Sequence, residues 1–153
     1  MTNLALLVVG IFAAFASDAG VTHPAERGPS DHVWVLQKLQ NERVIRRGVE
    51  VATLRFNSDH TVTGTWACNS VGPGKFKWAT IPGQMHGKLA TDGTGAGIIT
   101  VVGCGNARVV AIANRFWRRM ETAREWSVDH RGLTVRFSDE SSARFVREEP
   151  KGS

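Results

Sequence analysis

The chain has 153 residues, the length of one domain, and 42% of them are hydrophobic, which is enough for an ordinary core. Its formal charge of +5 and its pI near 9.9 favour anionic surfaces in general. The charge does not choose among nucleic acid, lipid headgroups, anionic polysaccharide and acidic protein, so composition alone assigns no function.

The N-terminus carries an uncharged apolar run over residues 4–16. The run is too short to span a bilayer comfortably, and it ends in Ala14-Phe15-Ala16, a small-x-small pattern that signal peptidases accept. We therefore predict a signal peptide over 1–16, with a cut after residue 19 as the alternative. No lysine or arginine precedes the run, and an uncleaved anchor is the competing interpretation. Because no cysteine lies near the cut, we expect export to the periplasm or outside the cell, but not a lipoprotein.

Glycine and proline without apolar periodicity predict a flexible linker over residues 17–30. The folded domain is predicted over 31–147, followed by a polar tail over 148–153. Its first strand is expected around Trp34, where Val33, Val35 and Leu39 alternate only roughly with Trp34, Leu36 and Lys38.

A hairpin is predicted next, from a strand over Val51–Phe56 and a second over Thr61–Cys68. Turn-forming side chains separate the two. Gly64, in the middle of the second strand, suggests a bulge or a sharp bend, as in a sheet that curls toward closure. Residues 69–74 have the composition of a turn, and short strands are expected at Lys75–Trp78 and Gly87–Thr91. An apolar run continues at 98–102.

One helix is predicted from Asn106, a favourable N-cap, to about Thr122. A step of 100° per residue gathers its large apolar side chains in one arc. The opposite arc holds four arginines, Arg108, Arg115, Arg118 and Arg119. Guanidinium groups gathered this way could bind phosphates or carboxylates, and the alternative is a face whose charges are simply solvated.

After the helix, strands are expected at Trp126–Val128, Leu133–Phe137 and Ala143–Val146, joined by polar turns. The fold class is therefore α+β: a curved antiparallel sheet or partial barrel with one amphipathic helix packed on it.

The two cysteines, Cys68 and Cys104, each lie beside a strand-like run. In an oxidising compartment such a pair predicts a structural disulfide. Free buried thiols, a redox pair and a metal site remain as alternatives. Metal is poorly supported because two cysteines without histidines at ligand spacing cannot complete a tetrahedral set. A redox motif would normally be a compact Cys-x-x-Cys.

Several residues together resemble the META domain, found in HslJ-like bacterial envelope proteins. They are Trp34, Gly64, Asn69 after Cys68, Gly72, Phe76, Thr100 and Gly103 before Cys104, followed by the helix and the closing hairpin. The resemblance covers about residues 31–147. It implies a small curved antiparallel sheet or partial barrel with one packed helix, usually exported, associated with stress tolerance of the envelope and without established catalytic residues. The arginine-rich helix departs from the acidic residues that this family often carries there.

The sequence offers no catalytic motif. The histidines are scattered over the linker and the predicted turns without ligand spacing, and no Gly-x-Ser-x-Gly element occurs. We therefore expect no enzyme activity, no cofactor and no metal.

The leading hypothesis is a non-enzymatic exported envelope protein, a monomeric binding or stress-tolerance module. Its partner would be an unknown envelope protein or an anionic ligand, with no specific nucleic acid. One alternative is a secreted inhibitor or ligand-binding protein that uses loops at 69–74 and 81–97. The other is a polyanion binder that uses the four helix arginines.

Overall fold

The computed structural model describes residues 28–30, 32–44, 51–91, 97 and 103–148. Within them, the strands form one antiparallel sheet in the order β2-β1-β3-β4-β5-β6-β7-β8-β9, and β1 also pairs with β9. Eight strands therefore close into a barrel, with β2 as a short extension beside β1. The sequence predicted a partial barrel, and the closure corrects this because β1 hydrogen-bonds to neighbours on both sides.

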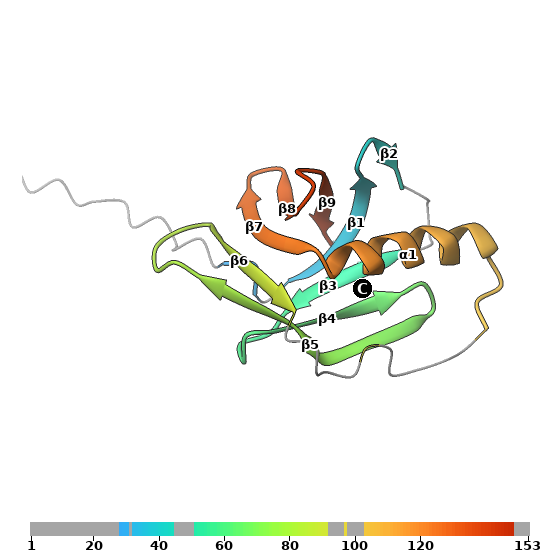
Figure 1. Ribbon diagram of the computed structural model, residues 1–153, viewed down its shortest axis with the longest axis horizontal. Helices are drawn as coiled ribbons and strands as arrows, with labels where there is room; N and C mark the ends of the chain where they lie inside the picture. The colour runs from blue at the N-terminus through green and yellow to red at the C-terminus, as the bar shows by residue number, and fades with distance from the viewer. Residues whose placement is uncertain (1–27, 31, 45–50, 92–96, 98–102, 149–153) are drawn as a thin grey trace, which may run out of the picture.

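The element bounds are as follows. The strands are β1 (Val33–Leu39), β2 (Glu42–Arg43), β3 (Ala52–Phe56), β4 (Thr61–Trp66), β5 (Asn69–Thr80), β6 (His86–Thr91), β7 (Ala123–Asp129), β8 (Gly132–Phe137) and β9 (Ser142–Arg147), and the helix is α1 (Ala107–Met120). Figure 1 shows α1 lying across the barrel strands. No helix among the described residues is long and apolar enough to cross a membrane.

Several predictions fall outside the described residues. They are the signal peptide (1–16), most of the linker (17–27), the apolar run at 98–102 with Thr100, and the end of the polar tail (149–153).

The barrel interior is filled by large side chains. Alternate residues of each strand point inward, as strand geometry requires, and the aromatic ones meet edge to face. Phe56, Trp78 and Trp126 form one such cluster, with ring centroids 5.6–6.0 Å apart. The indole N–H of Trp126 donates to the carbonyl of Ala79 at 3.0 Å. The interior is therefore a packed core.

The domain begins slightly before residue 31. The fully buried indole of Trp34 donates to the carbonyl of Pro29 at 2.8 Å, and Ser30 forms a parallel bridge with Phe56. A buried indole N–H needs an acceptor, and the end of the predicted linker supplies it. Residues 29 and 30 thus belong to the fold.

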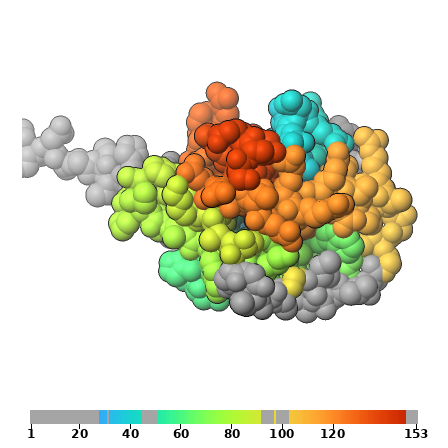
Figure 2. Space-filling model, in the orientation of Figure 1, coloured from blue at the N-terminus to red at the C-terminus, as the bar shows by residue number. Residues whose placement is uncertain are grey.

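The helix packs across the barrel between β2 and the β4–β5 hairpin, as the space-filling view in Figure 2 also shows. The side chain of Asn106 accepts a hydrogen bond from the backbone N–H of Val109 at 3.2 Å, which confirms the predicted N-cap. Phe116, at the middle of the apolar arc, has no exposed surface and meets Phe145 of β9 at 5.4 Å. The indole N–H of Trp117 donates to the carbonyl of Thr65 on β4 at 2.9 Å. The helix is therefore attached both to β9 and to β4.

The predicted loop at residues 69–74 is wrong. These residues form the first half of the twelve-residue strand β5, and β4 ends at Trp66 rather than at Cys68. The chain reverses at Ala67 and Cys68, and Ala67 takes a φ of 51°, in the left-handed region. A two-residue turn with positive φ matches the twist of a hairpin, so the strands continue to the turn on both sides.

The predicted bulge at Gly64 is present. The register between β4 and β5 shifts between Val62 and Gly64, opposite the segment that holds Pro73 and Gly74. Proline cannot donate to a ladder and is tolerated at bulges, and Gly74 takes a φ of 110°. These residues, which suggested a turn, instead bend a continuous strand.

Candidate functional site

The two cysteines tie the β4–β5 turn to the segment that leads into α1. Cys68 and Cys104 form a disulfide with their Cα atoms 5.7 Å apart. The backbone N–H of Cys68 and the Nδ2 of Asn69 lie 3.2 and 3.6 Å from the Sγ of Cys104. Asn69 is almost fully buried, so its amide faces the bridge from inside the fold. Of the four alternatives for the cysteines, the geometry favours the structural disulfide.

The motif residues beside the disulfide gather around Trp117. Gly64 lets the indole lie against β4, since a Cβ there would be 3.2 Å from the ring and 1.9 Å from the carbonyl oxygen of Thr53. The ring of Phe76 lies 5.6 Å from that of Trp117, and Trp66 and Trp117 are both partly buried against the core. The motif therefore seats the helix on the β4–β5 hairpin.

The remaining motif residues have other places. Trp34 lies in the core of the barrel, and the backbone N–H of Gly72 donates to the carbonyl of Gly97 at 3.0 Å. Gly103 is exposed beside the disulfide. Nothing is described for Thr100.

A groove lies between the C-terminal half of α1 and the β4–β5 hairpin, with a volume of about 190 Å³. Apolar atoms make up most of its lining, and the polar groups come from β5, from α1 and from the C-cap of α1. The lining residues are Trp66, Val71, Lys75, Phe76, Gly97, Asn114, Trp117, Arg118 and Glu121. Lys75 and Glu121 form an ion pair at 2.5 Å, which links the strand to the end of the helix.

The four helix arginines do not act as one face. Arg115 forms an ion pair with Glu42 of β2. Arg119 donates to the carboxylate of Asp139 at 2.8 Å, in the β8–β9 turn. Both guanidinium groups therefore form ion pairs that connect the helix to β2 and to the β8–β9 turn.

The other two arginines are separated. Arg108 is exposed near the start of the helix, while Arg118 lines the groove on another side. Neither forms an ion pair with a carboxylate of the described residues. The arrangement therefore weakens the hypothesis of a polyanion site built from all four arginines.

The loop hypothesis also changes. Residues 69–74 are a strand, and part of the second predicted loop forms β6. Residues 81–85 remain a connection, and Ile81 in it is the exposed large apolar side chain of the described residues.

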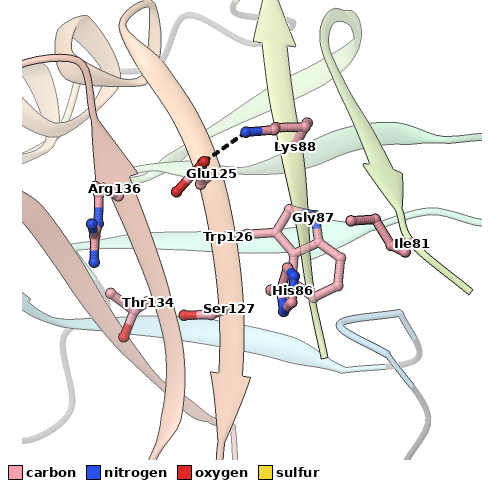
Figure 3. Close-up of a pocket in the computed structure, with 9 residues that line it drawn as sticks. All are labelled: Ile81, His86, Gly87, Lys88, Glu125, Trp126, Ser127, Thr134 and Arg136. Carbon is pink, nitrogen blue, oxygen red and sulfur yellow. Dashed lines mark hydrogen bonds and ion pairs between the residues drawn. The ribbon is translucent and has the colours of Figure 1, made fainter. Parts of the chain in front are cut away.

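A second hollow, of about 390 Å³, lies on the outer face of β6, β7 and β8. Figure 3 shows Lys88 of β6 joined to Glu125 of β7, at 2.6 Å, with Arg136 of β8 across the hollow. The Lys88 ammonium lowers the pKa of Glu125 below its usual range, with a smaller contribution from Arg136. His86 and Ser127 also line this surface. Because Glu125 is already paired with Lys88, the residues that line this hollow include no carboxylate free to orient His86 for catalysis with Ser127.

Within the described segments, no group of three or more histidine, cysteine, aspartate or glutamate side chains is placed to hold a metal ion. The described histidines lie on the surface or against tryptophans: His32 meets Trp34 edge-on at 5.8 Å, and His60 lies 5.3 Å from Trp78.

Comparison with known families agrees with this arrangement. A family model described as the META domain matches residues 29–150. The chain belongs to the META domain family. The match starts where Pro29 and Ser30 join the fold. No curated protein matches the chain.

Two solved structures resemble this META domain. One, an NMR structure of a protein, is 16% identical over 79% of this chain and 92% of its own, with a TM-score of 0.53. The other, an NMR structure of a protein from Burkholderia xenovorans, is 18% identical over 80% of this chain and 85% of its own, with a TM-score of 0.52. At these identities the likeness supports the fold alone.

Proposed function

We propose that this META domain protein is an exported binding module of the cell envelope that contributes to stress tolerance without catalysing a reaction. The observation that carries the proposal is the disulfide between Cys68 and Cys104, with Asn69 buried against it. Disulfides persist in oxidising compartments and are rare in the cytosol. The apolar run at residues 4–16 supplies a route to such a compartment.

A binding role without catalysis agrees with the chemistry of the two hollows. In the hollow on β6–β8, Glu125 is paired with Lys88, and in the groove Glu121 is paired with Lys75. A general base must be free to accept a proton from a substrate, whereas both of these carboxylates are paired with lysine ammonium groups. The groove instead combines apolar area with a few polar groups, which is the usual composition of a binding site. We expect the protein to act as a monomer.

The test is the intact mass of the protein from the envelope fraction of its host, with thiol alkylation before and after reduction. We expect a mass that lacks residues 1–16 or 1–19, with two alkylated thiols only in the reduced sample. A full-length mass with two free thiols would overturn export. If a strain without the gene survives envelope stress as well as its parent, the stress-tolerance role fails.

A further inference from the structure

We propose that the groove between α1 and the β4–β5 hairpin binds a small carboxylate that carries one ring. This inference rests on the proposed binding function and names the ligand class and the residues. The floor is supplied by Trp66, Val71, Phe76 and Trp117, of which Val71 and Phe76 are buried and the two tryptophans are half-buried. Half-buried indoles beside a hollow leave ring surface on which a flat apolar group can lie.

The size of the groove limits the ligand. Its volume of about 190 Å³ is below the roughly 300–1,000 Å³ of sites for drug-sized ligands. One ring or a short branched chain fits this space. A polymer could place only one of its units there.

The charge of the rim selects an anion. Asn114, Arg118 and Glu121 are spaced four and three residues apart, so they lie on one side of the helix. Glu121 is neutralised by Lys75 at 2.5 Å. Arg118 is exposed and has no ion pair with any carboxylate of the described residues. An entering carboxylate would therefore meet a guanidinium that can donate two parallel hydrogen bonds.

The tryptophan hydrogen bonds supply a second, independent observation. Trp34, Trp78, Trp117 and Trp126 each donate their indole N–H to a backbone carbonyl at 2.8–3.0 Å. Trp66 is the exception, because its indole N–H has no acceptor among the described residues. That donor is left for solvent or for a polar atom of a ligand. The groove thus has Arg118 as an unused charged donor at its rim, and its lining includes Trp66, whose indole N–H has no protein acceptor among the described residues.

The experiment is a ¹⁹F NMR titration of the purified protein, with its disulfide intact, using 4-(trifluoromethyl)benzoate and the neutral 4-(trifluoromethyl)benzamide. We expect the benzoate to bind with a dissociation constant of about 1 mM, as suits a ligand of this size, and the amide to bind at least fivefold more weakly. Arg118→Gln should weaken benzoate binding about fivefold or more and leave amide binding unchanged, because it removes the charged donor.

Two further variants make the result specific. Arg108→Gln removes an exposed arginine of the same helix outside the groove and should leave the benzoate affinity within about twofold. Asn114→Phe places a ring at the groove mouth and should abolish binding of both probes. Equal affinity for the two probes, an equal loss in the two arginine variants, or no binding at 10 mM would overturn the inference. The titration does not depend on localisation, so an exported protein that fails it would lose only this inference.

Discussion

Removing the disulfide should lower the stability of the domain by several kcal/mol. The bridge closes a loop with a sequence separation of 36 residues. In the chain-entropy treatment a loop of that length contributes about 3.8 kcal/mol through restriction of the unfolded chain. The Cys68→Ser/Cys104→Ser variant removes this restriction and places hydroxyl oxygens, which can also accept hydrogen bonds, beside the amide of Asn69. The loss of unfolding free energy should therefore lie close to this value.

Urea unfolding followed by tryptophan fluorescence measures the loss. With an m-value of about 1.5 kcal/mol/M, the midpoint should fall by about 2.5 M. Dithiothreitol should lower the midpoint of the wild type by a similar amount and leave that of the variant unchanged. If reduction shifts the wild-type midpoint by less than about 0.5 M, the bridge does not restrict the unfolded chain as reasoned, and the structural role of the cysteines is refuted.

Two further predictions concern turns. Gly132 and Gly83 both have positive φ, but a Cβ at Gly132 would lie 2.1 Å from a β9 carbonyl oxygen, whereas one at Gly83 would meet nothing within 4 Å. In thermal unfolding, Gly132→Ala should therefore lower the free energy of unfolding by more than about 3 kcal/mol, and Gly83→Ala by only about 1 kcal/mol. Equal losses in the two variants would contradict the register of β8 and β9. The hydroxyl of Ser141, then the guanidinium of Arg119, lowers the pKa of Asp139 from 3.8 to about 2. A lowered pKa stabilises the fold above pH 3.8, and this stabilisation is lost as the pH falls through 2. The difference in Tm between the wild type and Asp139→Asn should therefore be present at pH 5 and absent below pH 2, and a difference that persists there would refute this assignment.

The elements with strong local patterns were predictable. The helix prediction needed only the apolar period and the N-cap at Asn106, and the strands after it needed only alternation and polar turns. The loop at 69–74 was mispredicted because glycine and proline are typical both of turns and of bulged strands, and local composition does not distinguish them. Closure of the barrel depends on the β1–β9 pairing, which joins residues about 110 positions apart and leaves no local pattern.

The groove was missed for a similar reason. Arg118 was grouped with the other helix arginines because a helical wheel places residues around one axis and says nothing of the neighbouring strand. Trp117 was assigned to the core arc, and it does pack there, but it also faces the hollow beside Trp66. A site between two elements becomes visible only once their packing is known.

The same residues seat the helix and line the groove, and this decides which variants are informative. A side chain at Gly64 would meet both the Thr53 carbonyl and the Trp117 ring, so a substitution there displaces the helix and destroys the groove together. Phe76 is buried against Trp117, so a substitution there would also disturb the seating of the helix and the groove together. Loss of binding in either variant would not separate recognition from folding. Arg118 is exposed and lies at the rim, so its replacement changes the charge of the groove while the packing beneath remains. The rim arginine, and not the family motif, is therefore the residue through which ligand recognition by this domain can be measured.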